Sequence, residues 1–179
     1  LLISIIGYGK LFENLCFGKF NKKGDNLIYT GFYGLMFVTL ISLITSYFIP
    51  HNFYHNLILH SSGFLYLFFN FNQKDRNYLK YIFYISLFTA SALMISKTND
   101  DFSYYHFPFT KYLTEQKIIF GMGNLNHGFN LISSLFFLNS TFYLPFINFF
   151  SFHFSLLYFL IFFNYFVLKE IFNKTNDKV

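Results

Sequence analysis

The chain has 179 residues, of which 54% are hydrophobic and 26% aromatic, while only 12% are charged. Soluble domains carry about 25% charged residues, so this composition argues against an ordinary soluble domain and favours a membrane protein. The formal net charge of +5 does not indicate a nucleic-acid partner, because the basic residues lie in short clusters between apolar runs, where lipid headgroups are the expected neighbours. The single cysteine, Cys16, leaves no partner for an intrachain disulfide.

The start of the chain is apolar, and residues 1–9 are expected to be the end of an earlier membrane-spanning helix. The opening stretch LLISIIGYGKLFENL lacks the basic segment and the small-residue cleavage site of a signal peptide. We therefore interpret residues 1–179 as a single fragment of a larger membrane domain.

The apolar runs that follow predict a series of membrane-spanning helices. Residues 29–49 carry no charge and match the roughly 20 residues that a helix needs to cross the hydrocarbon core; Pro50 ends the run. Residues 55–72 and 79–97 are shorter apolar runs that reach spanning length if their flanking polar side chains lie at the interface. Residues 146–168 are again long, uncharged and aromatic.

The basic residues predict on which side of the membrane each connection lies. Ten of the 13 occur in three groups: Lys10, Lys19, Lys22, Lys23; Lys74, Arg76, Lys80; and Lys169, Lys174, Lys178. The positive-inside rule places all three groups in the cytoplasm, which leaves residues 98–145 outside. A crossing at residues 131–145 would move the basic tail outside, so this stretch is expected to be an interfacial helix. The predicted fold class is all-α, a polytopic transmembrane helical bundle with an external loop that contains short surface-lying helices.

The external loop begins with an acidic pair, Asp100 and Asp101, and continues to His106. Adjacent carboxylates beside a histidine can act as a general base or hold a divalent cation, although no feature of the sequence demands a cation. The alternative interpretation is a polar stop after an apolar helix, in which the aspartates cap the next helix or solvate the loop.

Further along the loop, the stretch GMGNLNHG is a glycine-rich turn that presents Asn124, Asn126 and His127. It lacks the lysine and the hydroxyl residue of a phosphate-binding P-loop.

A second group of histidines comprises His51, in the turn after the predicted span 29–49, and His55 and His60, in the first part of the predicted span 55–72. The first two would share a face if they were helical, as metal-binding pairs do. Pro50 favours a turn instead, and no nearby carboxylate or cysteine completes a ligand set, so we predict no metal site. His153, inside the last span, is expected to face the interior of the bundle.

The order of these features resembles the first external loop of C-type integral membrane glycosyltransferases. The resemblance is carried by an acidic pair after a span, followed by YYHFPFTKYL, GMGNLNHG and SSLFFLNSTFYLP, and it covers roughly residues 80–145. It is closest to uncharacterised multi-pass proteins of the bacterial cell envelope. The matching positions are Asp101 with Tyr105 and His106, Asp100 as the adjacent alternative, and Gly123, Asn124, Ser133 and Ser134.

This resemblance implies an inverting transfer of a sugar from a polyprenyl-phosphate donor to a glycan or lipid acceptor. Asp101 or Asp100 would be the base, and His106 would orient the base or contact the phosphate. The implied substrate-binding residues are Tyr105, Asn124, Asn126 and His127. The implied location is the bacterial inner membrane, with residues 98–145 on the external side.

The alternative function is a non-catalytic membrane component, such as a subunit for polysaccharide flipping, export or polymerisation. A transporter is expected to carry ionisable or Gly/Pro-interrupted positions near the middle of its spans, and these spans are nearly free of charge. A polymerase would typically depend on external arginines, whereas Arg76 is the only arginine and is predicted to be cytoplasmic.

Overall fold

The computed structural model describes residues 1–18, 27–93, 100–130, 133–147 and 149–176. These parts of the chain form helices and no strand, which confirms the all-α prediction. The α-helices are α1 (Leu2–Phe17), α2 (Thr30–Ser46), α3 (Phe53–Phe69), α4 (Gln73–Leu93), α5 (Phe107–Glu115), α6 (Ser134–Thr141) and α7 (Phe154–Asn176). A π turn, η1 (Phe102–His106), and the 3-10 turns η2 (Met122–Asn124), η3 (His127–Asn130) and η4 (Phe149–His153) complete the fold.

Helices α2, α3, α4 and α7 lie where the apolar runs predict spans. In the described parts of the chain, the segment Phe149–Asn173 is the one helical stretch that is long and apolar enough to cross a membrane, and α2 is a shorter apolar helix. Several predicted positions lie outside the described residues: 94–97 of the span 79–97, 98–99 and 131–132 of the loop, residue 148, Lys19, Lys22, Lys23, Lys178 and the side chain of Lys174. The helical class is thus established, and the multi-pass arrangement remains a prediction.

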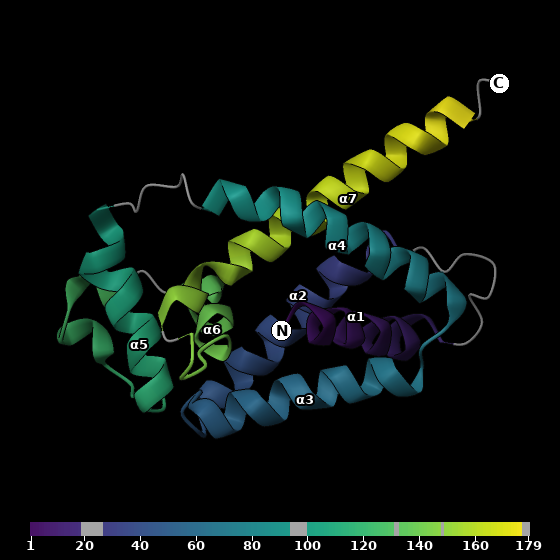
Figure 1. The fold of residues 1–179 in the computed structure, drawn as a ribbon. Coiled ribbons are helices and arrows are strands. Elements are labelled where there is room, and N and C mark those ends of the chain that lie inside the picture. The colour runs from purple at the N-terminus through teal and green to yellow at the C-terminus, as the bar shows by residue number, and fades with distance from the viewer. Residues whose placement is uncertain (19–26, 94–99, 131–132, 148, 177–179) are drawn as a thin grey trace.

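Helix α1 is longer than the sequence indicated and lies inside the bundle. It continues through Lys10 to Phe17, whereas a partial span over residues 1–9 was expected. Its side chains Ile5 and Ile6 are buried, and it packs against both α2 and α3 (Figure 1). The contact is close because Gly7 faces the backbone carbonyl of Gly63 on α3, where an added Cβ would overlap the oxygen. Small residues permit this close approach of helix backbones.

Helix α6, Ser134–Thr141, falls within residues 131–145, where an interfacial helix was predicted, and it is packed among other helices of the bundle. Its buried residues are Phe136, Phe137, Leu138, Ser140 and Thr141. Phe136 and Phe137 pack in one apolar cluster with Phe109 of α5, while Leu138 joins the main core. The helix contacts α2, α3, α5 and α7. A helix with apolar residues on several faces is buried by its neighbours rather than laid on a surface.

The connection between α3 and α4 is fixed to α1 by an ion pair. Lys10 Nζ lies 2.6 Å from Asp75 Oδ2, and Asp75 is 1% exposed. The same Asp75 oxygen accepts the backbone N–H of Asn72 at 2.8 Å, and Asn72 Oδ1 accepts the N–H of Asp75 at 3.1 Å. This reciprocal pair is a capping box at the start of α4. Lys10 of α1 and the α3–α4 connection therefore lie together, at the end of the bundle opposite α5 (Figure 1).

Candidate functional site

A π turn precedes α5 at the start of the predicted external loop. The backbone N–H of Phe107 donates to the carbonyl of Phe102, a spacing wider than that of an α-helix. Single π turns within helices are rare and frequently occur at functional sites. Here the turn directs Phe102, Tyr105 and His106 toward one cavity, together with Thr110 one turn later.

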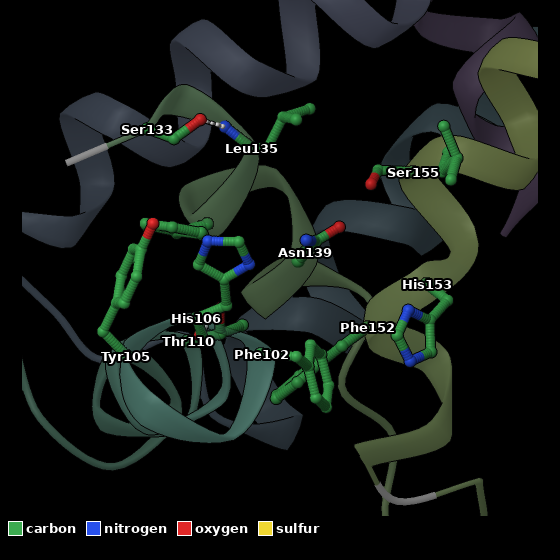
Figure 2. A pocket seen from close by; sticks show the side chains of 12 residues that line it. Phe102, Tyr105, His106, Thr110, Ser133, Leu135, Asn139, Phe152, His153 and Ser155 are labelled. Atoms are coloured by element: carbon green, nitrogen blue, oxygen red, sulfur yellow. Dashed lines mark hydrogen bonds between the residues drawn. The ribbon is translucent and has the colours of Figure 1, made fainter. Parts of the chain in front are cut away.

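The cavity has a volume of about 300 Å³ and lies between η1, α5, α6 and the start of α7 (Figure 2). Its lining residues are Phe102, Tyr105, His106, Thr110, Ser133, Leu135, Phe136, Asn139, Phe152, His153, Ser155 and Leu156. The aromatic rings form much of the wall, and hydroxyl, amide and imidazole groups are set among them.

Two imidazole rings approach the cavity from different elements. His106 comes from η1, and its ring centroid lies 5.0 Å from that of Phe136. His153 comes from η4 and stacks on Phe102, with the centroids 4.9 Å apart and the rings 28° from parallel. Figure 2 shows the two rings on opposite sides of the cavity, with Asn139 between α6 and α7. His153 was expected to face the interior of the bundle, and it lines this interior cavity.

Asn139 is one of three polar residues of the cavity that sequence reasoning missed, together with Thr110 and Ser155. Its Oδ1 atom is buried and has no hydrogen-bond partner among the described residues. A buried carbonyl oxygen without a donor is costly and therefore needs an explanation. No sequence signal distinguishes Asn139 from the other asparagines of this Asn-rich chain.

The predicted site residues separate into those that line the cavity and those that do not. Tyr105 and His106 line it. Asp100 and Asp101 are exposed on the helical turn just before Phe102 and are not lining residues.

The glycine-rich turn packs against Tyr105, one of the residues that line the cavity. Asn124 and His127 are exposed, and Asn126 Oδ1 accepts the backbone N–H of Gly128 at 2.9 Å. Gly128 is buried against Tyr105, where a Cβ would meet the tyrosine side chain. The turn thus holds Tyr105 in place, but its Asn and His side chains do not line the cavity. Of the two serines matched by the resemblance, Ser133 lines the cavity and caps α6, since its Oγ accepts the N–H of Leu135.

The second histidine group forms a buried hydrogen-bond network at the start of α3. His51 is 0% exposed, and its Nδ1 lies 2.6 Å from Ser140 Oγ. Because the Ser140 hydroxyl donates to the carbonyl of Phe137, the consistent assignment has His51 Nδ1–H donating to Ser140. Nε2 lies 3.0 Å from the Thr45 hydroxyl, whose single proton has two acceptors within reach, this nitrogen and the carbonyl of Ser42 at 3.3 Å. Burial lowers the pKa of His51 to about 3, with a smaller contribution from His55, so the ring is neutral at pH 7.

Asn56 and His60 of α3 satisfy the carbonyl groups at the end of α6. Asn56 Nδ2 donates to the carbonyls of Ser140 at 2.9 Å and Tyr143 at 3.1 Å, and His60 Nε2 lies 2.9 Å from the carbonyl of Thr141. The last carbonyls of a helix have no partner within it, so these side chains cap α6. The i, i+4 spacing of Asn56 and His60 in an apolar run was the signal for a polar face directed at another helix.

The chain is thus an all-helical protein with an aromatic-lined polar cavity at one end and a fully hydrogen-bonded polar network beside it. It belongs to the family described as Domain of unknown function (DUF8201), whose model matches residues 1–179. No curated protein and no solved structure matches the chain.

Proposed function

We propose that this chain is a polytopic membrane protein. Large apolar side chains are exposed on four of its helices: Met36, Leu40 and Ile44 on α2; Tyr54, Ile58 and Phe68 on α3; Phe83, Leu87 and Phe88 on α4; and Leu156, Phe159 and Phe163 on α7. Monomeric soluble proteins rarely expose so much contiguous apolar surface. Contact with lipid acyl chains would cover these faces.

The packing inside the bundle supports the same proposal. The close approach of α1 and α3 at Gly7 and Gly63 is the small-residue contact common between membrane helices. Side chains of α3 hydrogen-bond to the carbonyl groups at the end of α6. Non-helical backbone within a membrane is tolerated when protein surrounds it and satisfies its polar groups.

We infer the orientation from the two ends of the bundle. Lys10 and Lys74 lie at the end of the bundle that carries the α3–α4 connection. Lys169 lies at the same end, because its Nζ is 6.0 Å from the ring centroid of Tyr81 on α4. The positive-inside rule assigns this end to the cytoplasm. The cavity near α5 then lies toward the external face.

We further propose that the protein transfers a sugar from a lipid-linked donor to an acceptor of the cell envelope. The observation that carries this proposal is the cavity, which brings His106 and Tyr105 of the predicted loop together with His153 and Asn139. Imidazole N–H groups can donate to phosphate oxygens, and the hydroxyl groups of Tyr105 and Ser133 can hydrogen-bond to a sugar hydroxyl. The aromatic walls provide flat apolar surfaces for a sugar ring.

In this proposal Asp101 is the general base, with Asp100 as the adjacent alternative. Its carboxylate takes the proton of the acceptor hydroxyl as that oxygen attacks the anomeric carbon. The new bond joins the acceptor oxygen to the anomeric carbon, and the bond from that carbon to the phosphate oxygen breaks. The lipid phosphate leaves with the electron pair, and the configuration of the sugar inverts.

The test uses the full-length gene with Asp100→Asn and Asp101→Asn, separately and together. Loss of the base is expected to lower transfer of one envelope sugar by about 100-fold or more, with the protein level and membrane insertion unchanged. Glu115→Gln is the matched control, because Glu115 is an exposed carboxylate at the far end of α5. Normal glycans in the Asp100, Asp101 double variant would exclude an aspartate base.

The alternative is a non-catalytic component that binds a lipid-linked glycan. The exposed position of Asp100 and Asp101, outside the cavity lining, favours it. Under this alternative, His106→Gln and Asn139→Leu alter envelope glycans while both aspartate variants leave them unchanged. The same set of variants therefore distinguishes the two functions.

A further inference from the structure

The turn that follows α5 carries large apolar side chains that are exposed. Phe120 is 92% exposed, Leu125 is 82% exposed, and Ile119 is 56% exposed. We refer to these three residues as the apolar tip. Exposed apolar side chains that lie together mark surfaces that contact a membrane or another protein. The apolar tip is separate from the cavity described above, because none of its residues lines that cavity.

The rest of the turn holds the apolar tip in this exposed position. Met122, between Phe120 and Leu125, is buried in the apolar cluster that contains Phe109. Gly121 has a φ of 87°, a left-handed conformation that favours glycine and permits a tight turn. The backbone N–H of Leu125 donates to the carbonyl of Met122 at 2.9 Å. The buried Met122 therefore fixes which side chains of the turn are exposed.

A backbone hydrogen bond ties this turn to the end of a proposed membrane span. The N–H of Ile118 donates to the carbonyl of Ser46, the last residue of α2, at 2.9 Å. Because α2 lies in the predicted span 29–49, the turn starts at the level where that span leaves the membrane. Phe48, just beyond α2, is 72% exposed. The apolar tip therefore begins beside the external end of a helix whose exposed side we propose to face lipid.

We propose that the apolar tip inserts into the outer leaflet of the membrane and anchors the turn after α5 there. This inference rests on the membrane placement and orientation proposed above. The three side chains enter the region between the lipid headgroups and the acyl chains, where they are removed from water. Lys117, exposed just before the tip, reaches the headgroup phosphates with its ammonium group. The same turn carries Gly128, which packs against Tyr105, so the anchor fixes this wall of the cavity near the membrane surface.

The experiment places a tryptophan at the apolar tip, because the 179-residue chain contains none. Phe120→Trp is reconstituted in phosphatidylcholine vesicles whose acyl chains are brominated near the headgroup, where bromine quenches the emission of a nearby tryptophan. Loss of most of the emission relative to unbrominated vesicles is expected, with a blue shift of the remainder. Leu125→Trp is a second reporter and should give the same result. Adding Ile119→Ser and Leu125→Ser to Phe120→Trp should reduce the quenching, because less apolar surface remains to insert.

Two control variants separate this inference from the membrane placement on which it rests. Phe88→Trp reports on α4, where Phe88 is 79% exposed and is proposed to face acyl chains. Ser103→Trp lies in η1, close to the exposed carboxylates of Asp100 and Asp101, and it should remain accessible to aqueous iodide.

Quenching by bromine at Phe120→Trp, but not at Ser103→Trp, would support the anchor. Quenching at Phe88→Trp without quenching at Phe120→Trp would overturn the anchor and leave the membrane placement intact, whereas no quenching at either position would overturn both proposals. Equal quenching at Phe120→Trp and Ser103→Trp would overturn the assignment to the apolar tip. Protection of Phe120→Trp from both bromine and iodide would mean that a protein surface covers the tip, which also overturns the anchor.

Discussion

Two polar regions of this protein lie side by side and differ in how their hydrogen bonds are satisfied. In the network around His51, Asn56 and His60, each of these side chains has hydrogen-bond partners in the protein. In the cavity around His106, the Asn139 oxygen is buried without a donor among the described residues. Residue type alone would assign a similar role to both regions, since each contains histidine, asparagine and serine. The two regions differ in whether their buried polar atoms have hydrogen-bond partners, and this difference distinguishes a structural network from a candidate ligand site.

The strongest test of this comparison replaces one asparagine in each region by leucine. Asn56→Leu removes the side-chain donor to the carbonyls of His51 and Tyr143, at about 1–3 kcal/mol for each acceptor that loses its partner. The carbonyl of Ser140 also loses this donor but keeps the backbone N–H of Tyr143 at 3.3 Å. Asn139→Leu removes an oxygen that has no partner in the described parts of the chain, so its effect on stability should be below about 1 kcal/mol. Chemical unfolding in detergent micelles measures both. Equal destabilisation would mean that the two regions do not differ.

A second test concerns the close contact between α1 and α3, the helix that carries Asn56 and His60. Gly63→Ala places a methyl group against the backbone of Ser4 and the ring of Tyr8 on α1. Overpacking of this kind is expected to destabilise the bundle by about 1–3 kcal/mol, because α1 must shift away from α3. Ser61→Ala, at an exposed position of the same helix, is the control. A thermal melt of the two variants should show a lower transition for Gly63→Ala only.

The pH dependence of stability should follow His51. Its pKa is about 3 in the folded protein, against 6.5 for a histidine in water, so between these values the unfolded state binds the extra proton. The contribution of His51 to stability is therefore complete above about pH 7.5 and decreases as the pH falls, with a loss of about 1.4 kcal/mol from this histidine alone at pH 5.5. Unfolding curves at pH 7.5 and 5.5 test this. The exposed His127, changed to Gln, should leave the difference intact, whereas His51→Gln should reduce it.

The smallest effect is expected at the exposed ion pair of α5. Lys111 Nζ lies 3.8 Å from Glu115 Oε1, and both side chains are largely exposed. Such pairs contribute about 0.5 kcal/mol or less, and salt screens them. Glu115→Gln should therefore change the unfolding midpoint very little. A large decrease would show that α5 depends on this pair more than its exposure implies.

Hydropathy was sufficient to predict the helical class and the existence of α2, α3, α4 and α7, because these elements are long apolar runs. It placed the end of α1 too early, at Lys10, since a charge ends an apolar window but does not end a helix. Lys10 is accommodated because Asp75, far along the chain, receives its ammonium group. Local sequence contains no information about such a partner.

The candidate site was predictable only in part, for a related reason. The sequence indicated Tyr105 and His106, because they follow an acidic pair at the end of an apolar run. It did not indicate Asn139, since whether a buried amide is paired depends on the neighbours that tertiary packing brings. The burial of α6 was missed because the prediction rested on counting membrane crossings. That count indicates whether a stretch crosses the membrane, but it contains no information about whether other helices enclose a short helix.

The capping of α6 by α3 joins a segment that is synthesised early to one that is synthesised late. Asn56 and His60 are translated before Ser140 and Thr141, so the donors are already present when the carbonyls of α6 emerge from the ribosome. A circular permutant that placed α6 ahead of α3 would reverse this order and expose an uncapped helix end to the biosynthetic machinery.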